Sequence, residues 1–268
     1  MKQPIAIISG ALRLPFLVRD SLKKQGYAPY VIGLKNYADP KLKPDLMVRL
    51  GAGGAIFREL KKRDIKQVMF VGAIGHPKFS DIRPDLWTFG MVARILTQDR
   101  GYDSLGTALL REVEKKGLKI VAAQDLCPDL TLPAGTHTKT KPNAQDKRDI
   151  ARAIEVSKII GAADIGHAAV VDKLVLGVEG AEGTKGLLER IAILKKKLSP
   201  KKSGVLAKMI KPGQDLRIDT TAIGADTIKE VAAAGLRGIV VDAKKCLIID
   251  RDEVIKLSNK LSLFLTTI

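Results

Sequence analysis

The sequence contains few of the residues that most directly reveal a chemistry. Its 268 residues include two cysteines, three histidines and 4% aromatic residues. Cys127 and Cys246 have no CxxC spacing and no neighbouring histidine pair, so neither a disulfide framework nor a structural zinc site is predicted. Because His76, His137 and His167 are widely separated and form no HExxH motif, we interpret each as a loop or core histidine rather than a metal ligand.

Long apolar runs are also absent from the sequence. No stretch approaches the roughly 20 consecutive apolar residues that a membrane span needs. The first ten residues, MKQPIAIISG, pass into a strand-like segment without a small-residue cleavage site. We therefore expect a cytoplasmic protein that is not processed at its N-terminus.

Complete nucleotide-binding and serine-hydrolase motifs are absent as well. Residues 51–54, GAGG, form neither a Walker A loop nor a dinucleotide fingerprint followed by an acid. The first turn, SGALRLP, has one glycine where a nicotinamide-binding loop needs more, and no GxSxG elbow occurs. These absences argue against a nicotinamide cofactor and against the commonest serine hydrolases.

Basic residues are present in excess. The chain has 46 Lys and Arg against 29 Asp and Glu, a formal net charge of +17. The resulting field attracts phosphate-rich partners, among them nucleic acid, anionic lipid headgroups and a diphosphate substrate. No Lys or Arg cluster alternates with Phe or Tyr, as surfaces that stack single-stranded nucleic acid require, so we expect no nucleic-acid partner.

The first half of the chain alternates short β-branched runs with stretches of helical periodicity, a pattern typical of a parallel sheet covered by helices. The expected strands are residues 5–9, 29–33, 67–72 and 118–123, and the expected helices are residues 14–24, 54–62, 85–97 and 104–116. We therefore predict an α/β protein whose N-terminal domain, residues 1–130, is Rossmann-like.

The segment after this domain lacks periodicity and is rich in proline and threonine, so we predict a linker over residues 131–145. Residues 146–268 are predicted to form a second α/β domain. Its expected elements are helices over residues 147–160 and 184–197, strands over 168–171, 174–179, 205–210, 238–241 and 246–249, and a last helix from Arg251. We expect Thr184 to cap one helix, and Thr227 and Glu230 to form a capping box on another.

The most concentrated polar motif is KMIKPGQDLRIDTT, residues 208–221, where a Pro-Gly pair imposes a turn. In alternating geometry Asp215, Arg217 and Asp219 would face the same side. Carboxylates suit magnesium, while Lys and Arg neutralise phosphate oxygens, so the motif suits a magnesium diphosphate site. The alternative is an exposed charged loop in which Arg217 pairs with one Asp.

A second polar cluster is LVLGVEGAEGT, residues 174–184, which places Glu179 and Glu182 among small residues before a helix. Its glycines allow close backbone approach to a ligand, and the first amides of the helix could bind an anion. The carboxylates indicate a metal or sugar hydroxyls, whereas the amides indicate phosphate. The alternative is an ordinary strand-to-helix turn whose acids favour the helix dipole.

Taken together and in order, these motifs resemble the LpxI-type UDP-2,3-diacylglucosamine pyrophosphatase family. The resemblance runs over nearly the whole length, and its segments are IAIISGALRLP, FVGAIGHP, RGYDSLGTALLREVEKKG, LPAG, ADIGHAAVV, LVLGVEGAEGT and KPGQDLRIDTTAIGADTI followed by AAAGLRGIVVDA. The strongest are VEGAEGT and KPGQDLRID. The chain departs from the family pattern at His76, His167 and Lys185.

The resemblance implies a Rossmann-like domain joined to a family-specific second domain, a homodimer, and magnesium-assisted hydrolysis of UDP-2,3-diacylglucosamine. The products would be UMP and 2,3-diacylglucosamine 1-phosphate, known as lipid X, and Mn²⁺ is the alternative ion. Asp219 matches the acid of the RxD motif expected at the metal. The positions that match the family's substrate-facing turn and its aspartate before the fourth helix are Glu179, Glu182, Gly183, Thr184 and Asp103.

The mechanistic hypothesis assigns Asp219, with Asp215, to the metal, and Lys208, Arg217 and Lys211 to the charge on phosphoryl oxygens. We expect Gln214 to contact the substrate. The basic field would hold the enzyme at the surface of an anionic inner membrane. Two rival functions remain at this point: a basic nucleic-acid-binding protein, and a nucleotide-binding module without catalytic activity.

Overall fold

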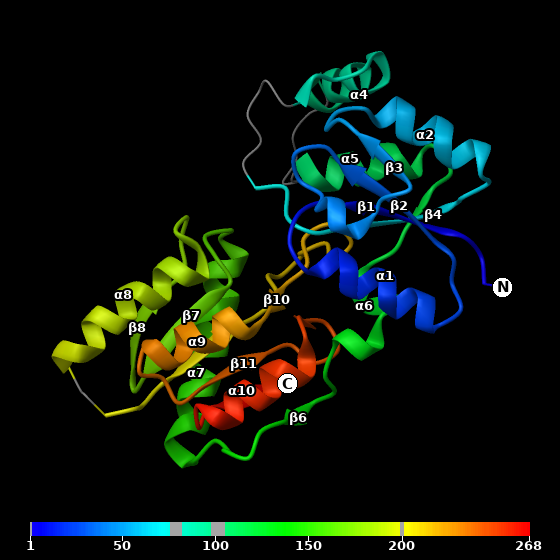
Figure 1. Cartoon of the computed structure of the whole chain (residues 1–268). Helices are drawn as coiled ribbons and strands as arrows, with labels where there is room; N and C mark the ends of the chain where they lie inside the picture. Colours follow the sequence, from blue (N-terminus) through cyan, green and yellow to red (C-terminus); the bar gives the residue numbers. More distant parts are fainter. Residues whose placement is uncertain (1, 76–81, 98–104, 199–200) are drawn as a thin grey trace. The chain divides into compact units, whose positions relative to one another are not determined.

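The computed structural model describes residues 2–75, 82–97, 105–198 and 201–268. The chain divides into two compact units, Met1–Cys127 and Pro128–Ile268. Each unit has a sheet of its own (Figure 1). The segment predicted to be a linker differs from that expectation: it belongs to the second unit, where β6 (Gly135–Thr136) pairs with β13 (Phe264–Thr267) at the edge of the sheet.

The first unit contains a five-stranded sheet with strand order β3-β2-β1-β4-β5, in which every pairing is parallel. This is the strand order of a Rossmann fold, so the predicted fold is confirmed. Its strands are β1 (Ile5–Ser9), β2 (Pro29–Leu34), β3 (Leu46–Val48), β4 (Gln67–Val71) and β5 (Lys119–Ile120). Its helices are α1 (Leu14–Lys24), η1 (Pro40–Leu42), α2 (Gly53–Lys62), α4 (Leu86–Thr97), α5 (Leu105–Glu114) and α6 (Ala123–Leu126).

Helices cover both faces of this sheet, with α1 and α6 on one side and α2, α4 and α5 on the other (Figure 1). The central strand β1 is buried at all five positions, as expected for a strand covered on both faces. At its end, a Cβ on Gly10 would lie 2.5 Å from the carbonyl oxygen of Ala73, so only glycine permits this close approach to the end of β4. Strand β3 was not predicted, because three residues are too few to show a period.

The second unit contains a mixed six-stranded sheet with strand order β6-β13-β11-β9-β7-β8, and a separate pair of strands. Its strands are β6, β7 (Ala168–Asp172), β8 (Leu174–Val178), β9 (Val205–Lys208), β10 (Ala222–Ile223), β11 (Gly238–Val241), β12 (Leu247–Ile248) and β13. Its helices are η2 (Pro128–Leu130), α7 (Ala144–Ala162), α8 (Gly183–Leu198), α9 (Ala225–Ala233) and α10 (Arg251–Lys260). Strands β9, β11 and β13 are parallel, while β7 is antiparallel to β9 and β8 is antiparallel to β7.

Alternating residues of these strands enter two different cores. On one face, Leu206 and Ile239 pack with apolar residues of α8, α9 and α10. On the other face, Val205 and Val240 pack with Ala153 of α7. The strands are therefore apolar on both faces, which explains why they are visible in the sequence as continuous β-branched runs.

Two predicted helix caps are wrong. The helix α8 begins at Gly183, so the Thr184 hydroxyl lies inside the first turn and bonds elsewhere. The helix α9 begins after Gly224 without a side-chain cap, which puts Thr227 inside the helix. A capping box is present instead at the start of α7, where Asn143 and Asp146 bond each other's backbone amides.

A buried ion pair ties β7 to α8 in the second unit. Lys195 Nζ lies 2.6 Å from Asp172 Oδ2, and Ser203 Oγ donates to the same oxygen at 2.5 Å. The Lys195 side chain is 5% exposed, so its buried ammonium relies on this partner. Burial alone would raise the pKa of Asp172, but the hydrogen bonds from Lys195 and Ser203 outweigh it and the pKa lies below its ordinary value.

We predict that Asp172→Asn lowers the free energy of unfolding by about 3 kcal/mol, because it leaves a buried ammonium without a counter-ion. The contribution of Asp172 is present above its unfolded-state pKa of about 3.9 and is lost as the pH falls through the lower folded-state pKa. Denaturant unfolding at several pH values measures both effects. The matched control is Glu155→Gln, which breaks the exposed Arg152–Glu155 pair and should cost less than about 1 kcal/mol.

Candidate functional site

The topology of the second unit brings several polar residues to one edge of its sheet. Parallel β9 ends at Lys208, and antiparallel pairing places Ala168, the first residue of β7, opposite it. The amide of Glu179, directly after β8, donates to the carbonyl of Ala168 at 2.8 Å. His167, Glu179 and Lys208 therefore lie at the edge where the parallel strands have their carboxyl ends, which is where α/β sheets commonly bind ligands.

The carboxylate of Glu179 is the most firmly held group at this edge. It belongs to a residue that is 6% exposed. Its Oε1 accepts a hydrogen bond from the Thr184 hydroxyl at 2.7 Å, and its Oε2 accepts one from the His167 backbone amide at 3.0 Å. A Cβ on Gly166 would lie 2.3 Å from the Glu179 carbonyl oxygen, so glycine is required for β8 to end so close to His167.

The imidazole of His167 packs against this carboxylate, with Nε2 3.4 Å from Glu179 Oε2. Burial lowers the pKa of His167, Lys208 and Lys211 act in the same direction, and the carboxylates of Glu179 and Asp219 oppose them without reversing the shift. The ring is therefore neutral at neutral pH. Its Nδ1 atom is buried and has no hydrogen-bond partner among the described residues.

His167 was interpreted from sequence as a loop or core histidine. It is largely buried, as a core residue would be, yet it lies beside predicted site residues. The predicted hairpin contained the signal that could have found it. The hairpin pairs Ala169 with Val178, so residues 167 and 179 both lie at its open end, one before β7 and one after β8.

The loop after β9 does not alternate as predicted. The amide of Asp219 donates to the carbonyl of Asp215 at 3.0 Å, which is the bond of a helical turn. Both carboxylate oxygens of Asp215 are held by Arg217, from Nε at 2.9 Å and Nη2 at 2.6 Å. This bidentate pair is the alternative that the sequence left open, and the helical turn removes the alternation that would have put Asp215, Arg217 and Asp219 on one side.

Other predicted residues of this loop hold its backbone. Gln214 accepts from the Lys211 amide at 2.8 Å and donates to the Asp219 carbonyl at 2.9 Å. Lys211 Nζ pairs with Asp164 at 2.8 Å. Lys208 Nζ contacts only the Ala222 carbonyl, at 3.3 Å, among the hydrogen bonds found in the described part of the chain. Among the residues that the structure describes, Lys208 is therefore a cation without a carboxylate partner.

The turn before α8 is held by Glu182 as well as by Glu179. Glu182 Oε1 pairs with Arg190 at 2.5 Å, and its Oε2 accepts from the Gly180 amide at 3.1 Å. The hydrogen bond from Arg190 keeps the pKa of Glu182 below its ordinary value. Gly183 has a φ of +72°, so glycine suits the position at which the chain enters the helix.

Comparison with known proteins finds a matching family model for each of the two units. Residues 4–130 match the family model of the LpxI N-terminal domain, and residues 133–266 match that of the LpxI C-terminal domain. The chain belongs to the LpxI family. It is 37% identical over 267 residues to the UDP-2,3-diacylglucosamine pyrophosphatase LpxI of Caulobacter vibrioides, with 97% of this chain and 95% of that protein covered. The resemblance inferred from the sequence motifs is thus confirmed.

In this LpxI family member, the Asp219 carboxylate is open to a ligand. It is exposed, and no side chain or amide of the described residues hydrogen-bonds its carboxylate. The described residues contain no group of three Asp, Glu, His or Cys side chains that could hold a metal. Magnesium often takes one or two carboxylates together with waters and substrate phosphates, so Asp219 fits this mode whereas Asp215 is occupied by Arg217.

The remaining predicted residue of the LpxI pattern, Asp103, lies outside the described residues, as does His76. The assignments of the other candidates stay predictions. What the structure adds is their grouping: His167, Glu179 and Thr184 form one hydrogen-bonded cluster, which we call the Glu179 clamp.

We predict that Thr184→Val lowers the free energy of unfolding by about 2 kcal/mol, because it removes a hydrogen-bond donor from the buried Glu179 carboxylate. Thr184→Ser is the control, since it keeps the hydroxyl at the same position. Denaturant unfolding of the two variants provides the measurement. Equal stabilities of the Val and Ser variants would show that the Glu179 clamp does not need this bond.

Proposed function

We propose that this chain hydrolyses the diphosphate of UDP-2,3-diacylglucosamine to UMP and 2,3-diacylglucosamine 1-phosphate. The observation that carries the proposal is the 37% identity to UDP-2,3-diacylglucosamine pyrophosphatase LpxI over 97% of this chain. The edge of the second sheet supports it. There Lys208 presents a cation without a carboxylate partner, and Asp219 presents a carboxylate without a hydrogen-bond partner, each among the described residues.

In the proposed mechanism Asp219 holds the divalent ion, Mg²⁺ or Mn²⁺. A bound ion of this kind supplies positive charge to the oxygens of a reacting phosphate. Lys208 offsets negative charge on the phosphoryl group, and Arg217 contributes a guanidinium whose orientation Asp215 fixes through two hydrogen bonds. Lys211 and Gln214 shape the loop that carries Asp219.

The Glu179 clamp is proposed to contact the substrate. Thr184 and the His167 amide fix the direction of the carboxylate, and a group held in this way needs little reorganisation when it orients a sugar hydroxyl or the attacking water. Glu182 and Gly183 are proposed to shape the neighbouring turn, because Glu182 is held by Arg190 and the Gly180 amide.

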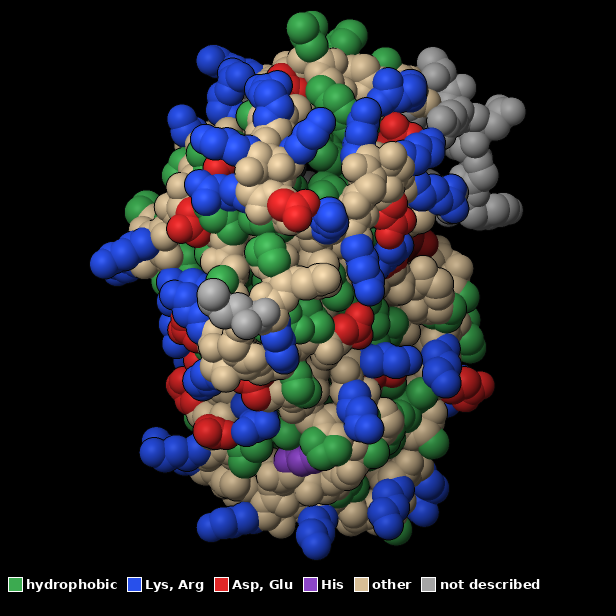
Figure 2. All heavy atoms as spheres, turned by 90° about the vertical axis from the view of Figure 1, so that its right-hand side faces the viewer, with side chains coloured by type: hydrophobic (Ala, Val, Ile, Leu, Met, Phe, Trp, Pro, Cys, Tyr) green, Lys and Arg blue, Asp and Glu red, His purple; other side chains and the backbone are tan. Residues whose placement is uncertain are grey.

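We further propose a cytoplasmic homodimer that associates with the anionic inner membrane. No helix of the described residues is long and apolar enough to cross a membrane. Lys and Arg side chains are spread widely over the face drawn in Figure 2, in keeping with the net charge of +17. Such a surface binds anionic lipid through electrostatic attraction, so washing membranes with high salt should release the protein.

The direct test is to incubate the purified protein with UDP-2,3-diacylglucosamine and magnesium and to follow the release of UMP. Release that depends on the protein supports the proposed hydrolysis. Binding of UMP or UDP without turnover would instead indicate a nucleotide-binding module. Binding of duplex or RNA that weakens steeply with salt, without hydrolysis, would indicate a nucleic-acid-binding protein.

We predict that Asp219→Asn lowers kcat by about a hundredfold or more, equivalent to about 3 kcal/mol, because the neutral amide is a poor ligand for a hard cation. Folding should change little, since Asp219 is exposed. Turnover, magnesium titration and thermal melts of the variant provide the measurements.

The control for this variant is Asp215→Asn. We expect a milder loss of kcat, because Asp215 holds Arg217 and Arg217 itself remains. Near-normal turnover by folded Asp219→Asn would contradict the metal assignment and make Glu179 and Glu182 the leading carboxylates.

We predict that His167→Ala lowers kcat by about tenfold with little change in KM, because it removes the ring that packs on Glu179. His167→Gln should retain most of the activity, because its amide can donate to the same carboxylate oxygen. Steady-state kinetics compare the two variants. A loss shared equally by both would show that the imidazole itself takes part.

A further inference from the structure

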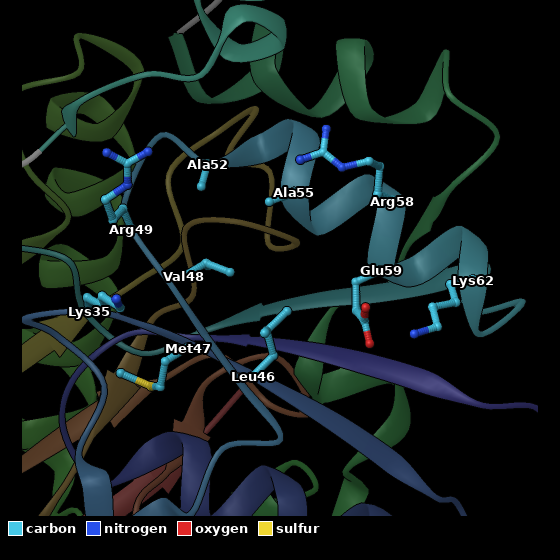
Figure 3. A pocket seen from close by; sticks show the side chains of 10 residues that line it. All are labelled: Lys35, Leu46, Met47, Val48, Arg49, Ala52, Ala55, Arg58, Glu59 and Lys62. Carbon is cyan, nitrogen blue, oxygen red and sulfur yellow. The ribbon is translucent and has the colours of Figure 1, made fainter.

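The first unit has an open hollow of about 460 Å³ between its edge strand β3 and the helix α2 (Figure 3). Apolar side chains line the part nearest the sheet and the helix: Leu46, Met47, Val48, Ala52 and Ala55. Met47 is one of the exposed large apolar residues of the chain, at 37%. The hollow therefore combines an apolar floor with access from solvent.

Four basic side chains surround this floor. Lys35 directly follows β2 and Arg49 directly follows β3, while Arg58 and Lys62 lie one turn apart on α2 (Figure 3). All four are exposed, and none makes an ion pair with another described residue. Because no carboxylate of the described residues forms an ion pair with them, these cations are available to an external anion.

Among the described residues, one carboxylate lines the hollow, and it already has partners. Glu59 Oε1 lies 2.6 Å from Arg63 Nε and accepts from the Tyr30 hydroxyl at 3.0 Å. Its direct ion pair is with Arg63, which is not among the residues that line the hollow, and Lys62 interacts with it only at longer range. The lining of the hollow is thus strongly positive.

The start of α2 does not form the phosphate-binding site that many Rossmann domains have at a helix N-terminus. The amide of Gly53 donates to Thr88 Oγ1 at 3.0 Å, and the amide of Ala55 donates to Asp85 Oδ2 at 3.3 Å. Asp85 also places a negative charge there. Anions at this hollow would therefore be held by long, exposed side chains alone, an arrangement that suits many phosphates on a surface better than one tightly enclosed phosphate.

We propose that this hollow docks the protein on a membrane through the headgroups of anionic phospholipids. The four cations complement the headgroup phosphates, and the apolar floor receives the glycerol and upper acyl region of a lipid. This inference is independent of the proposed hydrolysis, because vesicle binding can be measured without a substrate.

The test compares binding to vesicles of phosphatidylcholine with binding to vesicles in which a third of the lipid is phosphatidylglycerol. We expect the full chain to prefer the anionic vesicles, and the double variant Arg49→Gln/Arg58→Gln to bind them roughly 25-fold more weakly, since each basic residue near such a surface contributes about a factor of five. Thermal melts and turnover on a detergent-solubilised substrate should match those of the wild type.

The matched control is Lys116→Gln/Lys119→Gln, which removes the same charge at the opposite edge of the same sheet, beside β5. We expect this variant to lose less than about threefold. Equal losses in the two variants would assign the binding to the overall charge and overturn the proposal. Absence of binding by the wild type would also overturn it, as would displacement by UMP at constant ionic strength, which would identify a soluble nucleotide as the occupant.

Discussion

The antiparallel pairing of β7 with β9 is the constraint on which the candidate site depends. In an all-parallel sheet the segment before β7 would lie at the edge opposite the end of β9. Because β7 runs the other way, its first residue lies opposite Lys208, and the hairpin to β8 returns Glu179 to the same edge. One reversal of direction thus brings together residues from three separate parts of the chain.

The same arrangement buries the Glu179 carboxylate, which then needs hydrogen-bond donors. Glu179 is almost fully buried, and a buried carboxylate is costly unless donors surround it. Thr184 and the His167 amide are those donors, one from the helix after β8 and one from the segment before β7. The Glu179 clamp therefore ties α8 to the sheet edge, so that stability and the proposed substrate contact depend on the same bonds.

The pairing of individual charged residues in this protein differs from one region to another, and the net charge does not show this difference. In the second unit, cations are paired where they support structure, as in Lys195 with Asp172 and Arg217 with Asp215, while Lys208 has no carboxylate partner among the described residues. In the first unit, four cations without an ion pair among the described residues surround an apolar hollow. The net charge alone therefore does not indicate which cations can bind an anionic ligand; the pairing of individual residues does.

The sequence by itself determined the elements whose residues are periodic or buried on both faces. The bounds of β1, α1 and β11 follow directly from apolar runs and helical spacing, and the order of motifs such as VEGAEGT and KPGQDLRID is sufficient to indicate the LpxI family. Periodicity is a local property, so it can be recognised without knowing what each element packs against. Short strands such as β3 and β6 were not predicted from the sequence, because pairing with neighbouring strands stabilises them and their few residues show no pattern of their own.

Only the tertiary structure decided which polar residues meet. From residue spacing alone, Asp215 and Asp219 would face the same side of one motif, but Arg217 holds the carboxylate of Asp215 and that of Asp219 is exposed. His167 carried no signal as a single residue, and its place beside Glu179 depends on the register of a hairpin and on the lack of a side chain at Gly166. Hydrogen bonds and ion pairs are set by distances of a few tenths of an ångström between segments far apart in the chain, and residue spacing alone does not encode those distances.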